Sequence, residues 1–205
     1  MPINLFLARH GETELNAAYR FQGQSDPELN QTGLNQARFL AERLSVISLD
    51  RIISSDLRRA QSTAEIICER NICPLRIDSD LREISFGSWE GLTYAEIQAL
   101  DPQALNAWET DWISNSPPGG ENLLSLEKRM QGFLEHLKEE MDSSTILIVS
   151  HGGPLQVLIC LALGLPIREY WKFQISTASL SEIHLTKEWA SLKSLNDTCY
   201  LKKCK

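Results

Sequence analysis

Three short segments rich in apolar residues each stop abruptly at polar residues or glycine. Residues Ile3–Ala8 form a nearly continuous apolar run that ends at Arg9-His10-Gly11. Thr145–Val149 is the clearest run, it ends at Ser150-His151-Gly152-Gly153, and Arg51–Ser54 is a shorter third segment. Continuous runs of this length are typical of strands buried on both faces of a parallel sheet. The pattern therefore predicts three buried parallel strands, two of which end beside a histidine.

A helix is predicted after each of the first two strands. Thr32 can cap the first helix, and Ser55 and Asp56 are candidate caps for the second. Apolar residues then recur at helical spacing, at Leu34, Ala37, Leu40, Ala41 and Leu44 in one segment and at Ala60, Ala64 and Ile67 in the other. Amphipathic helices of this kind cover a sheet with their apolar side. The order strand, helix, strand, helix predicts the α/β class.

The rest of the chain changes character twice. Residues Leu81–Glu121 mix glycines and prolines with short helical stretches, which favours an excursion over the active face rather than a separate domain. A long amphipathic helix is expected over Leu123–Met141, and the alternating segments Ala178–Leu185 and Trp189–Leu195 predict late edge strands. The 205 residues contain no internal repeat or linker. We therefore expect one domain that covers residues 1–205.

Composition and charge exclude several classes of function. With 20 Lys and Arg against 27 Asp and Glu, the net charge of −7 argues against nucleic-acid binding by broad phosphate neutralisation. The five cysteines include no Cys-x-x-Cys pair, which favours free thiols in a reducing cytoplasm. The N-terminus has no basic segment before an apolar one, and the longest apolar run, Pro154–Pro166, is too short to span a bilayer. We expect a cytoplasmic protein with neither nucleic-acid nor membrane partners.

The candidate chemistry lies at the ends of the predicted strands. In open α/β sheets, ligands bind outside the carboxyl ends of the parallel strands, and His10 and His151 stand at two such ends. Glycine follows each histidine, so main-chain N–H groups can approach an anion closely there. Arg9 adds a guanidinium group, which can bind two oxygens of one phosphate at the same time. The pattern predicts an anion site built from the ends of these strands.

Five blocks of sequence, in order along the chain, are similar to the motifs of one enzyme family. They are Leu7–Thr13, the segment from Asn16 to Ala37, Ser54–Ala64, Leu81–Gly91 and Ser150–Gly153. One Arg-His-Gly alone is a weak signal, but five blocks in order are a strong one. The chain resembles the histidine phosphatase superfamily, which includes the cofactor-dependent phosphoglycerate mutases. The resemblance implies a single-domain, three-layer α/β/α sandwich with a mostly parallel central sheet.

The resemblance also implies a role for each matched residue. His10 would attack phosphorus, without a metal or cofactor, and water would then open the phosphohistidine. Arg9, Arg59 and His151 would hold the phosphoryl group, while Glu83 would protonate the leaving oxygen and later deprotonate the water. The substrate-binding residues carried over from the motifs are Arg9, Asn16, Gln22, Gly23, Arg59, Glu83, His151 and Gly152. A weaker block, Leu195–Asp197, departs from the family because Tyr200 stands where a histidine is usual.

Several residue assignments stay open at this point. Arg58 is the alternative to Arg59, because two adjacent arginines on a helix do not fix which one faces the site. Glu12 and Glu90 compete with Glu83 for the role of proton donor. The tryptophans of the excursion would either line a pocket for a large leaving group or pack the excursion itself; they are Trp89, Trp108 and Trp112.

Two rival functions belong to other classes. A metal site built from His10, Glu12, Glu83 and His151 is one, although these residues show no helical metal-ligand spacing. A non-catalytic protein that binds a phospholigand is the other. Such a protein would need neither the nucleophile His10 nor the proton donor Glu83, so the presence of both favours an enzyme.

The interval between Glu83 and His151 bears on the substrate. It is short and acidic here, whereas phosphoglycerate mutases carry a longer, basic insertion at this point. Compact members of this kind resemble α-ribazole phosphatases of cobalamin synthesis and broad-specificity bacterial phosphatases, and Pro117–Asn122 is similar to a segment of that group. We expect a small phosphorylated metabolite as substrate, with α-ribazole 5′-phosphate as the first candidate. A sugar or small-metabolite phosphatase and a phosphoglycerate mutase are the alternatives, and a homodimer is one option for the oligomeric state.

Overall fold

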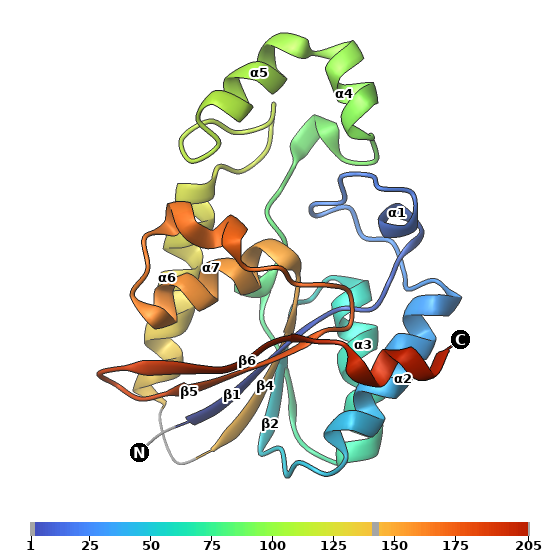
Figure 1. Ribbon diagram of the computed structural model, residues 1–205, viewed down its shortest axis with the longest axis vertical. Coiled ribbons are helices and arrows are strands. Elements are labelled where there is room, and N and C mark those ends of the chain that lie inside the picture. Colours follow the sequence, from blue (N-terminus) through green and yellow to red (C-terminus); the bar gives the residue numbers. More distant parts are fainter. Residues whose placement is uncertain (1–2, 141–143, 205) are drawn as a thin grey trace.

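Six strands form one sheet in the computed structural model, which describes residues 3–140 and 144–204. The strands are β1 (Ile3–Arg9), β2 (Arg51–Ser54), β3 (Leu75–Ile77), β4 (Thr145–Ser150), β5 (Leu180–Leu185) and β6 (Ala190–Asp197). Their order is β3-β2-β4-β1-β5-β6 (Figure 1). The first four neighbours pair in parallel, and β5 and β6 continue the sheet antiparallel beyond β1. The predicted, mostly parallel sheet is confirmed.

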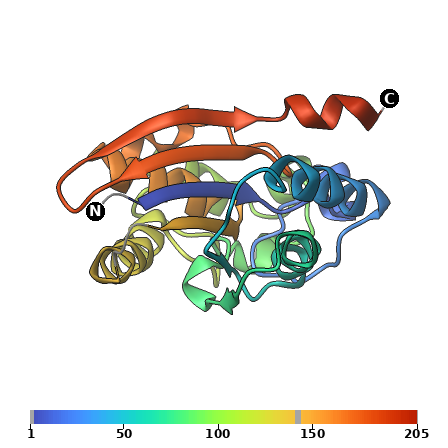
Figure 2. The ribbon, with the colours of Figure 1, turned by 90° about the horizontal axis from the view of Figure 1, so that it is seen from below.

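Helices cover both faces of this sheet. The α-helices are α1 (Glu14–Ala17), α2 (Gln31–Leu44), α3 (Arg58–Asn71), α4 (Tyr94–Leu100), α5 (Pro102–Thr110), α6 (Leu123–Glu139) and α7 (Gly152–Leu163). Short 3₁₀ turns are η1 (Ser79–Leu81), η2 (Gly87–Trp89), η3 (Ile167–Lys172) and η4 (Cys199–Cys204). After β6, the chain turns so that η4 lies against α2 (Figure 2). Along the described parts of the chain, no helix combines the length and the apolar character needed to cross a membrane.

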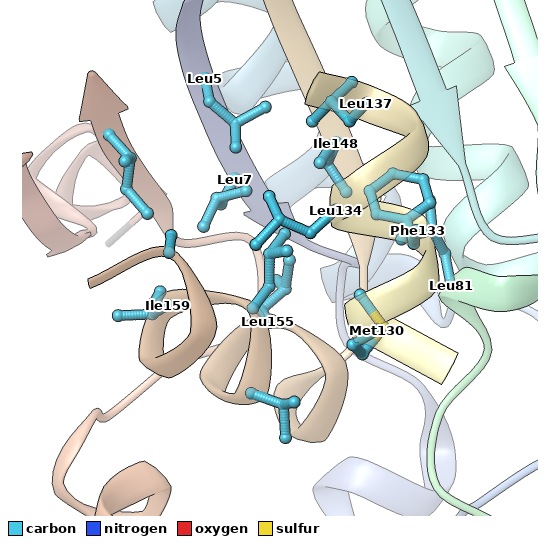
Figure 3. Close-up of a cluster of buried hydrophobic side chains, with 14 of the residues drawn as sticks. Leu5, Leu7, Leu81, Met130, Phe133, Leu134, Leu137, Ile148, Leu155 and Ile159 are labelled. Atoms are coloured by element: carbon cyan, nitrogen blue, oxygen red, sulfur yellow. The ribbon is translucent and has the colours of Figure 1, made fainter. Parts of the chain in front are cut away.

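Alternate residues of β1 enter two different apolar cores. Leu5 and Leu7 pack with side chains of α6 and α7, as Figure 3 shows. Phe6 and Ala8 point to the opposite face and pack with side chains of α2 and α3. Successive side chains of a strand point to opposite faces, so a strand covered on both sides is apolar throughout. This confirms the three-layer α/β/α sandwich and places the end of β1 in the middle of the molecule.

The predicted helix caps were wrong. The N-cap of α2 is Asn30, whose side chain accepts a hydrogen bond from the Gly33 N–H, whereas Thr32 lies inside the first turn. The N-cap of α3 is Leu57, and no side chain caps that helix. Ser55 and Asp56 do not cap it because their polar groups are used elsewhere, by a histidine and by Arg82 respectively. Several polar residues near a helix start leave the cap position ambiguous in sequence alone.

Three other expectations need correction in the details. The sequence pattern missed β3, which has only three residues with Arg76 at its centre. Of the two late strands predicted to lie at the edge, β6 does so, whereas β5 lies between β1 and β6. The helix α6 starts at Leu123 as expected but ends at Glu139, and the predicted last residue, Met141, lies outside the described residues.

The excursion between β3 and α6 has a small core of its own. Its buried residues are Trp89, Ile97 and Leu105, and Phe21 and Phe86 pack against them. Figure 1 shows α4 and α5 at one end of the molecule, away from the sheet. The excursion therefore adds a wall of side chains beyond the sheet, as the mixture of glycine, proline and short helical segments predicts.

Candidate active site

The ends of three parallel strands bring distant residues together. The register pairs Arg9 of β1 with Ser150 of β4, and Val149 of β4 with Ser54 of β2. The residues that follow these strand ends are His10, His151 and Ser55. The ring centroids of the two histidines lie 5.0 Å apart. The sequence prediction that both histidines meet at one edge of the sheet is thus supported by the geometry.

The hydrogen bonds of His10 fix its tautomer. Its Nδ1 lies 2.6 Å from the carbonyl oxygen of Gly11, and a carbonyl only accepts, so Nδ1 carries the proton. Burial, followed by the charges of Arg59 and Arg9, lowers the pKa of His10 well below its usual value. His10 is therefore neutral, and its lone pair lies on Nε2.

Arg59 links the two histidines. Its Nε donates to His10 Nε2 at 3.3 Å and to His151 Nδ1 at 3.2 Å. Its Nη1 and Nη2 donate to the carbonyls of Ser25 and Gly23, at 2.7 and 2.6 Å. Burial lowers the pKa of Arg59 to about 10, so the guanidinium keeps its charge at neutral pH. A fixed positive charge thus stands directly beside the lone pair of His10.

The neighbouring arginine, Arg58, points away from the histidines. Arg58 is exposed and forms ion pairs with Asp26 at 3.6 Å and with Glu28 at 3.2 Å. Side chains of adjacent residues on a helix diverge by about a quarter turn, so only one of the two can enter the site. The structure places Arg59, rather than Arg58, between the histidines.

His151 is held from both sides of its ring. Because Nδ1 accepts from Arg59, the proton of the neutral ring lies on Nε2 and is donated to Ser55 Oγ at 3.0 Å. Burial and the charge of Arg59 lower the pKa of His151 well below its usual value. Ser55 thus orients His151, a role that the sequence analysis missed when it treated Ser55 as a helix cap.

Arg9 and Glu83 complete the charged part of the site. Arg9 donates from Nη1 to the Ile175 carbonyl at 2.8 Å, and its buried Nε has no partner among the described residues. Glu83 Oε1 accepts from the N–H of Ile84 at 3.0 Å and from that of Gly153 at 3.1 Å. Burial raises the pKa of Glu83, and the charge of Arg9 opposes this rise. A carboxyl group that can hold a proton therefore lies at the start of α7.

Of the two glycines at the start of α7, Gly153 makes the closer approach to Glu83. A Cβ atom on Gly153 would lie 2.6 Å from Glu83 Oε1, which is too close for two unbonded atoms. At Gly152 the nearest atoms would lie 3.7 Å away, on the Arg9 guanidinium, which is an ordinary contact. The motif resemblance implied Gly152 as a binding residue. The structure adds Gly153, whose missing side chain leaves room for the carboxylate.

The other two candidate carboxylates are occupied elsewhere. Glu12 accepts from Asn30 Nδ2 at 3.0 Å, at the start of α2. Glu90 accepts from the N–H groups of Gln24 at 2.9 Å and Ser25 at 2.6 Å, and from that of Phe86 at 3.1 Å. Glu90 therefore ties the excursion to the loop whose carbonyls anchor Arg59. This structural role leaves Glu83 as the carboxylate that faces the site.

The remaining predicted binding residues lie beside the histidines. Asn16 Oδ1 accepts from the Thr13 N–H at 3.2 Å, and Gln22 Oε1 accepts from Thr13 Oγ1. Gly23 adopts a positive φ of 53° and turns its carbonyl toward Arg59. Within the described parts of the chain, the amide NH₂ groups of Asn16 and Gln22 donate to no protein atom. They are available to a ligand.

A pocket of about 570 Å³ opens from His10 toward the surface. It is lined by Arg9, His10, Asn16, Tyr19, Arg20, Phe21, Gln22, Gly23, Glu83, Phe86 and Trp171. The three tryptophans considered from sequence are not among these residues. Trp89 and Trp108 pack edge-to-face with centroids 5.7 Å apart, and Trp112 packs on Tyr170. Packing of the excursion is therefore their role, and Trp171 lines the pocket instead.

Backbone contacts around His10 come from segments that sequence reasoning did not connect. The Gly11 N–H donates to Thr63 Oγ1 at 3.1 Å, and the Ala178 N–H donates to the His10 carbonyl at 3.0 Å. Tyr200 in turn donates its hydroxyl to the Ala178 carbonyl. Tyr200 therefore supports the backbone of His10 indirectly, through Ala178, although it stands where the family motif has a histidine.

The rival metal site receives no support from the geometry. Among residues 3–140 and 144–204, no three or more His, Cys, Asp or Glu side chains are placed so that they could hold a metal ion. Glu12 in particular points to α2 rather than toward the histidines.

Known proteins resemble this chain over nearly its whole length. Residues 5–198 match the family described as histidine phosphatase superfamily (branch 1). Phosphoserine phosphatase 1 of Hydrogenobacter thermophilus is 35% identical over 97% of this chain and 94% of its own. The adenosylcobalamin/alpha-ribazole phosphatase of Salmonella typhimurium is 34% identical over 95% and 96%. The crystal structure of the alpha-ribazole phosphatase from Shigella flexneri superposes with a TM-score of 0.90 at 33% identity, covering 95% of this chain and 96% of that one. The chain, with its paired strand-end histidines, therefore belongs to the histidine phosphatase superfamily.

Proposed function

We propose that the protein is a phosphomonoesterase that needs no metal ion and forms a phosphohistidine on Nε2 of His10. One observation carries this proposal. The Gly11 carbonyl holds the proton of His10 on Nδ1, and the lone pair on Nε2 lies 3.3 Å from Nε of Arg59. A neutral, oriented imidazole beside a buried cation is suited to attack a phosphorus atom whose oxygens the cation binds.

The first step transfers the phosphoryl group to the enzyme. The Nε2 lone pair forms a bond to phosphorus while the bond from phosphorus to the ester oxygen breaks. Arg59 and Arg9 hold the phosphoryl oxygens, and the N–H groups at the start of α7 favour negative charge there. His151 can donate to the same oxygens once it gains a proton, and the nearby phosphate dianion favours that protonated form.

Glu83 acts as the general acid in the first step and as the general base in the second. Its raised pKa favours the protonated acid, which gives its proton to the leaving alkoxide. The resulting carboxylate then takes a proton from the attacking water while the bond between nitrogen and phosphorus breaks. The electron pair returns to Nε2, inorganic phosphate leaves, and the site regains its starting state.

We propose α-ribazole 5′-phosphate as the substrate to test first. Relatives named for this ester match the chain over nearly their full length, and the chain lacks the basic insertion of the mutases. A relative named phosphoserine phosphatase makes phosphoserine the second ester to test. A comparison of kcat/KM for these two esters, ribose 5-phosphate and 3-phosphoglycerate decides among them. Efficient conversion of 3- to 2-phosphoglycerate would instead indicate a mutase.

The location proposed for the protein is the cytoplasm. The cysteines whose side chains are described, Cys68, Cys73, Cys160 and Cys199, are all free thiols. Free thiols support a reducing compartment, where disulfides rarely persist.

The decisive experiment traps the intermediate. Alkaline quench during turnover of a labelled ester should give protein-bound phosphate that is stable to base, is labile to acid and maps to His10, and His10→Ala should give none. Activity should survive exhaustive chelation, and vanadate, which adopts the geometry of the transferring group, should inhibit. Label on a serine or aspartate, or activity lost with chelator and restored by a divalent ion, would refute the mechanism.

A further inference from the structure

The outer part of the pocket is walled by aromatic side chains. Four of its lining residues are aromatic: Tyr19, Phe21, Phe86 and Trp171. They come from three separate segments, namely the loop after α1, the turn before η2, and η3. Tyr19 is 89% exposed and Trp171 is 55% exposed. Large exposed aromatic side chains that share one pocket stabilise no core, and such clusters mark binding sites.

Three of these four aromatic residues, Phe21, Phe86 and Trp171, pack against other aromatic side chains. Phe21 and Phe86 pack edge-to-face with centroids 4.9 Å apart, and Phe21 also contacts the buried Trp89. Trp171, which comes from η3, contacts Tyr170 at a centroid distance of 4.6 Å and Trp112 at 5.8 Å. The surfaces that face the pocket are therefore positioned in advance, which lowers the entropy lost when a ligand binds.

Tyr19 holds its place at the mouth in an unfavourable backbone conformation. Its φ is +54°, in the left-handed region that non-glycine residues rarely adopt. The strained residue is fixed by a hydrogen bond from its N–H to the Asn16 carbonyl at 3.1 Å. Strain of this kind concentrates at ligand-binding positions, where the surrounding structure maintains it.

The charges of the outer wall disfavour an anionic leaving group. Among the described residues that line the pocket, Arg20 is the one cation that lies away from the histidines, and it is already bound. Its guanidinium pairs with Glu96 at 2.7 Å and donates to the Gly91 carbonyl at 2.6 Å. A carboxylate on the leaving group would thus compete with Glu96 for its partner. An uncharged ring meets no such competition and finds aromatic side chains in the lining of the pocket.

We propose that Tyr19 and Trp171 form an aromatic clamp that selects phosphate esters whose leaving group carries a planar, uncharged ring. The clamp rests on the proposed function, because it places the phosphate at His10 and the ring at the mouth. Between them lies a spacer such as a ribose. This clamp makes Tyr19 and Trp171 specificity-determining residues for a site whose chemistry lies elsewhere.

The test compares two esters that differ only in the ring. The ratio of kcat/KM for α-ribazole 5′-phosphate to that for ribose 5-phosphate should be about 10² in the wild type, since each aromatic contact contributes about 10-fold. Tyr19→Ala and Trp171→Ala should each lower this ratio about 10-fold, and Trp171→Phe should restore most of it. Trp189→Ala is the matched control, because Trp189 is 56% exposed but does not line the pocket. An unchanged ratio in both alanine variants would overturn the clamp.

Binding to the His10→Ala protein separates this proposal from the mechanism. Calorimetry should show tighter binding of α-ribazole 5′-phosphate than of ribose 5-phosphate, and Trp171→Ala on the same background should remove most of the difference. If the wild type forms no phosphohistidine, the proposed mechanism fails, yet this difference in affinity still decides the clamp. Equal affinity for the two esters in the His10→Ala protein would refute the clamp even if the mechanism holds.

Discussion

The inner and outer ends of the pocket are built in different ways. At the inner end, His10 lines the pocket and contacts Arg59 and His151. All three side chains are buried and hydrogen-bonded, and they lie directly after a central strand or in the first turn of α3. At the outer end, Tyr19 and Trp171 are exposed and lie in a loop and a short 3₁₀ turn. The scaffold thus fixes the phosphoryl chemistry, whereas the leaving group meets segments that can change without disturbing the sheet. One fold can therefore serve many phosphate esters.

Substitutions of two adjacent arginines should give the largest effect among the tests of this contrast. Arg59→Ala should lower kcat/KM about 10³–10⁵-fold, as the loss of an arginine that stabilises a transferring phosphoryl group does. Arg58→Ala should change kcat/KM less than about twofold, because an exposed ion pair contributes little. Arg59→Lys retains a charge but not the bridge between the histidines, so its activity should fall between the two. Circular dichroism checks that each variant is folded, and equal losses at 58 and 59 would contradict the geometry.

Glu83→Gln tests whether the inner end also supplies the proton. General acid catalysis contributes about 10²–10⁴-fold, so kcat/KM for an alkyl ester should fall by that factor. On p-nitrophenyl phosphate, whose leaving group needs little protonation, the first step should suffer far less. Slow hydrolysis of the phosphohistidine should then produce a burst of nitrophenol, which stopped-flow absorbance records. Equal losses on both esters without a burst would remove Glu83 from this role.

Acid pH should lower the stability of the folded protein through the two buried histidines of the inner end. The pKa values of His10 and His151 are depressed in the folded protein, so below about pH 6.5 the unfolded chain binds more protons and stability falls with falling pH. When the pH falls from 7.5 to 5.5, each histidine that stays neutral in the folded state lowers the free energy of unfolding by about 1.4 kcal/mol. In urea unfolding over this pH range, the free energy of unfolding of His151→Asn should fall by about 1.4 kcal/mol less than that of the wild type. His136→Asn, at an exposed position of α6, should behave as the wild type does.

The smallest expected effect lies at Tyr200, which supports the inner end indirectly. Tyr200→Phe removes the hydrogen bond to the Ala178 carbonyl, and a bond of this kind contributes about 1 kcal/mol to stability. We expect a decrease of that size in urea unfolding and a decrease in kcat of about threefold or less, with KM unchanged. A change in KM alone would show that Tyr200 acts on the outer end, which would break the division between the two ends.

The central strands could be predicted because their sequence pattern and their packing agree. Burial on both faces makes β1 and β4 apolar throughout, and the abrupt change at Arg9-His10 and Ser150-His151 marks where each strand meets the site. The motif resemblance then supplied Glu83, which lines the pocket together with His10, and Arg59, which donates to His10 Nε2. By contrast, β3 is too short to show a pattern, and its central residue is Arg76.

The supporting contacts could not be predicted, because they join residues far apart in sequence through small polar groups. Ser55 binds His151, Glu90 binds the backbone of Ser25, and Tyr200 binds Ala178. Nothing local distinguishes such a serine from a helix cap, or such a glutamate from a surface residue. The pocket tryptophan was missed for a similar reason. Trp171 reaches the pocket from η3, well beyond the excursion in which the candidate tryptophans were sought.

The position of β1 in the sheet has a consequence for how the protein is made. Leu5 pairs with Ile146 on one side and with Ile183 on the other, so β1 is synthesised first but gains its two neighbours last. A ribosome must translate through β5 before β1 can be inserted between β4 and β5. Until then the nascent chain exposes an apolar strand with two open edges, which is a template for aggregation and a target for chaperones. Chains truncated before β5 should therefore be inactive even though they contain both histidines.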